Sequence, residues 1–346
     1  MKSLFINMFT LFLTLIYGIV SILGHGNMVW PPVWQDAGGK IGTTPQQSCY
    51  AGLNYVFDDD EMKTGQVCMW YTNYTMKEGE TTLDDSLRTF ANIEPMYESY
   101  IERNPWLAPG TAKVHSGCGI AGGNPHGCPE GAPSLPGQDC SPYGGGFSYG
   151  PRAEDFDFVD VVTTEWKRGA IVTVGWSTVA NHGGGYSYRL CKVPVEGVSG
   201  LTEECFQQMS LNFASNMQWI QEGDDSSTRK EFLANRTTVG TFPTGSEWTR
   251  NPVPNCAGMG GGFFNEDPNI CPQGYQFPPP IEGLFGQGSN VYYDQKALFK
   301  WTLWDELKVP KDIELGDYVL SFRWDCEQTP QVWNSCSNIR IVDSGA

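Results

Sequence analysis

The sequence is poor in basic residues and in histidine. Its 346 residues include 22 Lys and Arg against 39 Asp and Glu, giving a formal net charge of −17, and only four are histidines. This charge argues against polyanionic partners, so we expect no nucleic acid, anionic membrane or pectin-like ligand. A neutral partner meets no such penalty. Cys-x-x-Cys pairs, which are typical of zinc ribbons, are absent, and no apolar run of membrane-spanning length follows residue 24.

The N-terminal segment has the layout of a signal peptide. Lys2 gives a short basic start, the stretch 4–23 is mainly apolar, and the run stops at the small residue Gly24. A membrane anchor is the alternative, because the run is long enough to span a bilayer. We predict that residues 1–24 are removed and that the protein is secreted and extracellular. Residues 25–346 should then form a single domain with an insertion at about 196–290.

The cysteines also fit an exported protein. All 11 follow position 24, and their density indicates disulfides formed in an oxidising compartment. Close spacing suggests three local pairs, which are Cys191 with Cys205, Cys256 with Cys271, and Cys326 with Cys336. Because the count is odd, one thiol is left over, and we place it among Cys118, Cys128 and Cys140. The sequons at Asn73 and Asn235 predict N-glycosylation.

Alternating apolar and polar residues are the main secondary-structure signal. The alternation is clearest in five segments, 170–176, 186–190, 299–304, 318–324 and 338–342. It indicates half-buried strands, whereas long amphipathic helices are scarce. We therefore predict an all-β fold: an immunoglobulin/fibronectin-III-like antiparallel β-sandwich with long disulfide-stapled loops and a few short helices.

His25 is the first candidate for chemistry. At a processed N-terminus it would offer a metal two nitrogens, its imidazole Nδ1 and its α-amine, whose reference pKa of roughly 8 makes proton loss inexpensive. A second imidazole would complete a T-shaped set of three nitrogens, which suits Cu(II). His182 could supply it, because it lies in a Gly-rich turn between two predicted strands. Without a metal, His25 would be an ordinary exposed residue and His182 a turn histidine with no ligand role.

These residues resemble those of lytic polysaccharide monooxygenases. The resemblance rests on His25-Gly26 followed by Pro31-Pro32, on Ala180-Asn181-His182 before an aromatic strand, and on the segment 318–341. It is strongest to the auxiliary activity 15 group and more distant to the bacterial chitin-binding type, the chitin-binding type-4 group. The stretch 109–128 is also similar, whereas the predicted insertion is poorly covered.

The resemblance implies a copper-dependent oxidoreductase that cleaves glycosidic bonds in chitin or cellulose with an external electron donor. One copper ion would be held by His25 and His182, with Ala180 crowding one axial side. Where the family has Tyr or Phe at the other axial position, this sequence has Trp333, and Gln331 would lie in the outer shell. These two histidines, Gln331 and Trp333 are the predicted catalytic set, and the alternative for the last two is a structural role. We expect a monomer. Three further residues are expected near the substrate surface: Trp30, Trp34 and His126.

Other functions remain open at this level. A noncatalytic copper-binding protein could use the same two histidines, and a carbohydrate-binding module would need no redox chemistry. The spacings of His115, Cys118, His126 and Cys128 could also serve a zinc site. Carboxylate pairs such as Glu154-Asp155 leave a glycoside hydrolase open. The sequence does not distinguish chitin from cellulose or from another neutral glycan.

Overall fold

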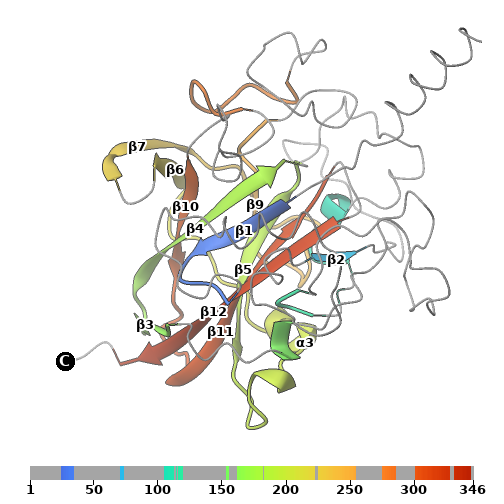
Figure 1. Ribbon diagram of the computed structural model, residues 1–346, viewed down its shortest axis with the longest axis vertical. Coiled ribbons are helices and arrows are strands. Elements are labelled where there is room, and N and C mark those ends of the chain that lie inside the picture. Colours follow the sequence, from blue (N-terminus) through green and yellow to red (C-terminus); the bar gives the residue numbers. More distant parts are fainter. Residues whose placement is uncertain are drawn as a thin grey trace, which may run out of the picture.

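Two packed β-sheets form the part of the chain that the computed structural model describes (Figure 1). The described residues are 25–34, 71–73, 105–112, 114, 116–119, 153–155, 162–181, 183–222, 225–254, 275–285, 301–327 and 331–343. The predicted all-β sandwich is confirmed. No helix in these ranges is long and apolar enough to span a bilayer.

The first sheet has five antiparallel strands in the order β1-β4-β10-β6-β7. Their bounds are β1 His25–Trp30, β4 Ile171–Ala180, β10 Thr302–Lys308, β6 Met217–Glu222 and β7 Asp225–Leu233. The predicted segment 170–176 lies almost wholly in β4. The segment 299–304 overlaps β10 only at 302–304, and residues 299 and 300 lie outside the described ranges. β1 lies at one edge, so the strand that begins at His25 has a single neighbour in this sheet.

The second sheet is built around the ladder β5-β11-β12. Its order is β2-β12-β11-β5-β9-β8, and β3 adds a parallel pairing with β12. The bounds are β2 Tyr71–Asn73, β3 Thr164–Lys167, β5 Gly185–Lys192, β8 Arg236–Thr237, β9 Trp248–Arg250, β11 Gly316–Asp325 and β12 Gln331–Val342. The three long strands confirm the remaining predicted segments. The described helices are short, as expected: η3 Pro105–Leu107, η4 Ala153–Asp155, η5 Val198–Gly200 and α3 Glu203–Gln207.

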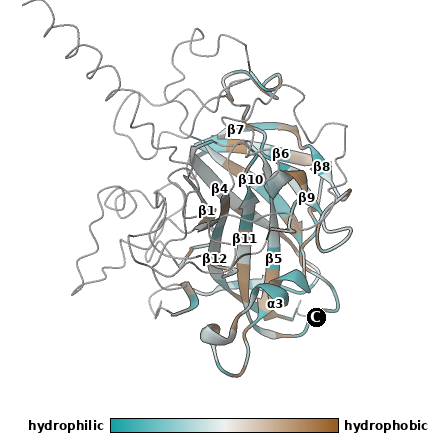
Figure 2. Ribbon diagram, turned by 90° about the vertical axis from the view of Figure 1, so that its right-hand side faces the viewer, coloured by the Kyte–Doolittle hydropathy of each residue, from teal (hydrophilic) through white to brown (hydrophobic). Residues whose placement is uncertain are grey.

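The core between the sheets is aromatic. Trp176 of β4 lies with its ring centroid 4.8 Å from that of Tyr186, 5.3 Å from Phe322 and 5.5 Å from Trp324. All four side chains are buried. Hydrophobic residues are spread along strands of both sheets in Figure 2, as expected for elements with one buried face. Each such side chain contributes about 1.5–3 kcal/mol through burial, so the strands that end at the candidate site are firmly held.

Residues 196–290 contribute strands to both sheets. β6 and β7 extend the first sheet beyond β10, whereas β8 and β9 extend the second beyond β5. The described part of the predicted insertion is therefore part of the sandwich itself. α3 lies within the stretch in which a short helix was expected.

The disulfide Cys191–Cys205 is confirmed and ties the end of β5 to α3. The predicted pair Cys326–Cys336 is wrong. Cys336 lies opposite Ser321 on β11, and Cys326 is five residues further along the chain than Ser321. At about 3.3 Å per residue of strand, Cys326 is too far from Cys336 for a disulfide.

Cys336 instead bonds to Cys118, with the two Cα atoms 5.1 Å apart. This bond fastens the segment 116–119 to the outer face of β12. It also removes Cys118 from the three candidates for the unpaired thiol. The other two, Cys128 and Cys140, and the predicted pair Cys256–Cys271 lie outside the described residues.

Candidate metal centre

Strand β1 brings His25 to the end of β4. In their antiparallel pairing His25 lies opposite Ala180, and the register is irregular between His25 and Gly26. Directly opposed residues in such a pair have Cα atoms about 4.5–5.5 Å apart. His182 follows Ala180 by two positions, so the two candidate ligands come from adjacent backbone segments, seen in Figure 1 where β1 (blue) runs beside β4. The side chains of His25 and Ala180, and the whole of His182, lie outside the description.

The residue before His182 is fixed by hydrogen bonds. Asn181 is fully buried, and its Nδ2 donates to the carbonyl of Val253 at 2.8 Å. Its Oδ1 accepts from the Gly183 amide at 2.9 Å and from Nδ2 of Asn251 at 2.8 Å. The bond to Gly183 links the residues on either side of position 182, a short-range contact that Asn side chains commonly make. The chain is therefore held immediately before and after the candidate ligand.

The two residues after His182 are conformationally restricted to glycine. Gly183 and Gly184 have φ values of 64° and 74°. A Cβ on Gly184 would lie 2.0 Å from the carbonyl oxygen of Asp325, so no larger residue fits there. Oε2 of Glu327 accepts a hydrogen bond of 3.3 Å from the Gly184 amide. The expected Gly-rich turn is thus a rigid connection that packs on the end of β11.

Trp333 lies in the core on the face of β12 that points toward β1. Its side chain is 1% exposed, and its Cα partner on β11 is Trp324. Ser335, two positions further and therefore on the same face, accepts a hydrogen bond of 3.0 Å from the Met28 amide of β1. Gln331 begins β12, and its side chain lies outside the description. Trp333 therefore occupies a buried core position on the face of β12 that points toward β1.

No family model matches the chain, and no curated protein sequence matches it. Solved structures of lytic polysaccharide monooxygenases match part or most of the chain. They include the auxiliary activity 15 enzyme from Thermobia domestica, at 14% identity over 54% of this chain and 67% of that chain, with a TM-score of 0.27. A chitin-binding domain from Burkholderia pseudomallei matches at 11% identity over 92% and 100% of the two chains, with a TM-score of 0.32. The cellulose-active monooxygenase CelS2, in complex with copper, matches at 14% identity over 92% and 100%, with a TM-score of 0.30.

The comparison of structures thus returns the family that the sequence resembles. At these identities and TM-scores, the chain's function has to be argued from its own residues.

Trp34 does not belong to a substrate surface, contrary to the prediction. It is 2% exposed and lies in the smaller of the two core clusters, where its Nε1 donates to Oδ1 of Asn338 at 2.8 Å. A half-buried partner for its only polar atom explains why the indole turns inward. Trp30 is half-buried at the end of β1. His126 lies outside the described residues.

The alternative zinc site loses one of its proposed ligands. Cys118 is bonded to Cys336 and has no thiolate to offer, while His115, His126 and Cys128 lie outside the description. In the ranges that are described, no three His, Cys, Asp or Glu side chains come together.

The carboxylate pair Glu154-Asp155 and the two sequon asparagines lie only partly within the described residues. Glu154 is buried and accepts a hydrogen bond of 2.6 Å from Oγ of Ser116, an environment typical of a structural carboxylate. Asn235 is half-buried between β7 and β8, and the side chain of Asn73 lies outside the description, so glycosylation stays a prediction.

Two buried charged residues, Arg250 and Glu327, lie next to the Gly-rich turn. Arg250 of β9 stacks on the ring of Phe277, with the guanidinium carbon 3.8 Å from the ring centroid. Burial lowers the pKa of Arg250 to about 10, and the carboxylate of Glu327 opposes that shift. Arg250 therefore stays protonated at neutral pH and balances the charge of Glu327 beside the turn.

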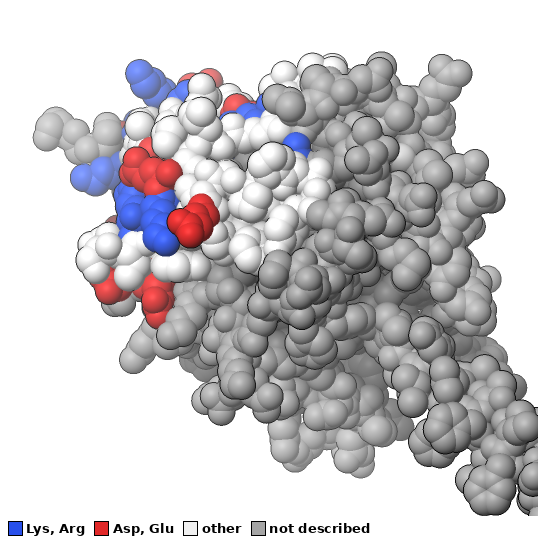
Figure 3. All heavy atoms as spheres, turned by 90° about the horizontal axis from the view of Figure 1, so that it is seen from above, with Lys and Arg blue, Asp and Glu red and all other residues white. Residues whose placement is uncertain are grey.

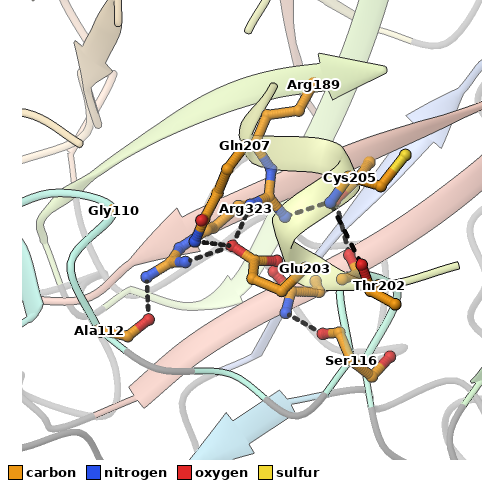
Figure 4. Close-up of polar contacts among 12 residues, drawn as sticks. Gly110, Ala112, Ser116, Arg189, Thr202, Glu203, Cys205, Gln207 and Arg323 are labelled. Carbon is orange, nitrogen blue, oxygen red and sulfur yellow. Dashed lines mark hydrogen bonds and ion pairs between the residues drawn. The ribbon is translucent and has the colours of Figure 1, made fainter. Parts of the chain in front are cut away.

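A second buried network connects α3 to the same end of β11 (Figure 4). Oε1 of Glu203 accepts hydrogen bonds from Arg189 and from Nη1 of Arg323, the latter at 2.9 Å. Nε of Arg323 donates to Oδ1 of Asp325 at 2.7 Å, and Oδ2 of Asp325 accepts from the Gly110 amide at 2.8 Å. Two arginines and two carboxylates balance one another, so the network fixes the backbone next to Gly184 without leaving a net charge.

Several of the exposed charges that are described form mixed pairs. In Figure 3, basic and acidic side chains lie next to each other on the face seen from above. Exposed ion pairs include Arg229 with Glu231 at 2.7 Å and Arg340 with Asp317 at 2.7 Å. On the described part of this face, charges of both signs are therefore mixed.

Sequence reasoning missed Trp324, Asn251 and Glu327 as parts of this site. All three are buried residues that contact the turn 181–184 from other elements. Trp324 stood in a predicted strand, where its alternation indicated only burial. The other two carried no local signal, because their roles depend on tertiary contacts.

Proposed function

We propose that this chain is a secreted, copper-dependent lytic polysaccharide monooxygenase that cleaves glycosidic bonds oxidatively in a neutral polysaccharide such as chitin or cellulose. The observation that carries the proposal is the register of β1 on β4, which places His25 opposite Ala180. Ala180 precedes His182 by two residues in the sequence. The proposal includes removal of residues 1–24, which would free the α-amine of His25.

The donor set fits copper. His25 would contribute its α-amine and its imidazole, and His182 a second imidazole, which gives the nitrogen-rich set that Cu(II) prefers. Hydrogen bonds from Met28 to Ser335 and from Ser337 to the carbonyl of Pro31 hold β1 against β12 at 3.0 and 3.1 Å. A site built from two short ligand segments needs this rigidity, because the segments must stay at one separation.

Bound copper would supply redox chemistry with dioxygen or hydrogen peroxide, and an external donor would supply electrons. The chain's own residues would set the environment of the site. In the proposal, Ala180 would contribute only a methyl group beside the metal, and the buried indole of Trp333 would help to exclude water from the site. Gln331, two positions before Trp333 on β12, would provide an amide for an outer-shell hydrogen bond.

The proposal is tested by mass spectrometry of soluble products. The secreted protein, loaded with one equivalent of copper, is incubated with chitin or cellulose and with ascorbate as the electron donor. Oxidised oligosaccharides are expected from the wild type and from the surface variant Asp343→Asn, and none from His182→Ala. Copper binding without oxidised products on any polymer would favour a noncatalytic copper protein. Polymer binding that is independent of copper would favour a carbohydrate-binding module.

A further inference from the structure

One indole touches both segments that carry the proposed ligands. Trp324 of β11 is fully buried, and its Nε1 donates a 2.8 Å hydrogen bond to the carbonyl of Gly183. Its other edge lies against Gly26, where a Cβ would be 2.5 Å from Cζ3 and 2.7 Å from Cε3. Gly183 follows His182, and Gly26 follows His25.

The two contacts use opposite edges of the same rigid bicycle. The N–H of the five-membered ring faces the turn, whereas Cε3 and Cζ3 of the six-membered ring face β1. A phenyl or aliphatic side chain can occupy one of these places but cannot span both and donate a hydrogen bond. The indole therefore packs between the two backbone segments and limits how closely they can approach, in addition to the pairing of β1 with β4.

The indole itself is held in place by its neighbours. Its ring centroid is 5.5 Å from that of Trp176, and its Cα partners in the second sheet are Tyr186 and Trp333. All three neighbours are buried. Because a close-packed core resists changes of rotamer, Trp324 has little freedom to follow movements of either segment.

We propose that Trp324 is a positioning residue that fixes the separation between the His25 and His182 segments for copper. The role rests on the proposed function, since it concerns the geometry of that site. Trp324 need not touch the metal, because it acts through the backbone of the residues that follow each histidine.

The test is copper binding to Trp324→Phe, with Trp304→Phe as the matched control. Trp304 of β10 is also a buried tryptophan, but its ring stacks on Trp219 at 6.3 Å, and its Nε1 has no hydrogen-bond partner in the described part of the chain. Calorimetric titration with Cu(II) is expected to give an affinity about tenfold or more weaker for Trp324→Phe, and within about twofold of wild type for Trp304→Phe. The Cu(II) electron paramagnetic resonance spectrum should change only in the first variant, while thermal unfolding reports the stability loss of both.

Equal affinities and spectra for the two variants would overturn the positioning role while leaving the proposed function intact. Failure of the wild type to bind copper would instead refute the proposed function, and this role with it.

A second pair of variants covers the case in which Trp324→Phe does not fold. Gly26→Ala adds one methyl group against the indole from the β1 side. Gly175→Ala is its control, because a Cβ there meets the indole of Trp304 at 3.0 Å, on the neighbouring strand. Weaker copper binding by Gly26→Ala than by Gly175→Ala is expected. Wild-type affinity and an unchanged spectrum in Gly26→Ala would contradict the role of Trp324.

Discussion

Replacing Asn181 with alanine tests whether the backbone around His182 is as firmly held as the contacts imply. The substitution removes hydrogen bonds to the Val253 carbonyl, the Gly183 amide and the Asn251 side chain. All of these residues are buried. A buried polar group left without its partner costs about 1–3 kcal/mol, and the site can relax in part, so we expect Asn181→Ala to lower the free energy of unfolding by about 3–5 kcal/mol.

Equilibrium unfolding in urea measures this loss, with Asn338→Ala as the control. Asn338 provides the acceptor for Nε1 of Trp34, so its removal is expected to cost about 1–2 kcal/mol. Copper gives a second comparison. At a free concentration about 100 times its Kd, copper should stabilise the wild type by about 2.7 kcal/mol, and Asn181→Ala by clearly less. A cost for Asn181→Ala no larger than that for Asn338→Ala would refute the reasoning.

Two further predictions concern the framework behind the site. Glu203→Gln should lower the free energy of unfolding by about 3 kcal/mol, because it leaves two buried arginines without one of their balancing negative charges. Asp343→Asn should change the free energy of unfolding by under about 0.5 kcal/mol, because Asp343 is 63% exposed and its ion pair lies at the surface. Urea unfolding of both variants checks the contrast, which similar values would contradict. Replacing both Cys191 and Cys205 with alanine should cost about 3 kcal/mol, because their disulfide closes a short loop, with a sequence separation of 14. An unchanged unfolding midpoint in the absence of reductant would show that the bond does not restrain the unfolded chain.

The central strands were predictable because one face of each packs apolar side chains between the sheets, which imposes a period of two. β5 and β11 carry the alternation over most of their length although both of their faces are buried, because polar residues such as Arg189 and Arg323 lie on the other face. In β4 and β12 it is clear only over 171–176 and 338–342. β7 escaped prediction because it is an edge strand whose residues are nearly all exposed, so no period is imposed on it. β8 and β9 are two and three residues long, too short to carry a pattern.

The ligand candidates could be proposed from position in the sequence, but their proximity could not. His25 stood out only beside a cleavage site, and His182 only in a Gly-rich turn. Their relation depends on the register of β1 against β4, which no local pattern specifies. The prediction of the disulfide partner of Cys336 was wrong for the same reason. Cys118 is distant in sequence and contacts β12 only through tertiary packing.

The most direct test of the copper site concerns the α-amine of His25. Cu(II) is titrated calorimetrically into the secreted protein that begins at His25 and into the same protein with one alanine added before it. The extension keeps both imidazoles but moves the free amine away from His25 Nδ1. We predict one tight equivalent of copper for the first protein and at least tenfold weaker binding for the second. Equal affinities would contradict a site built on an N-terminal histidine.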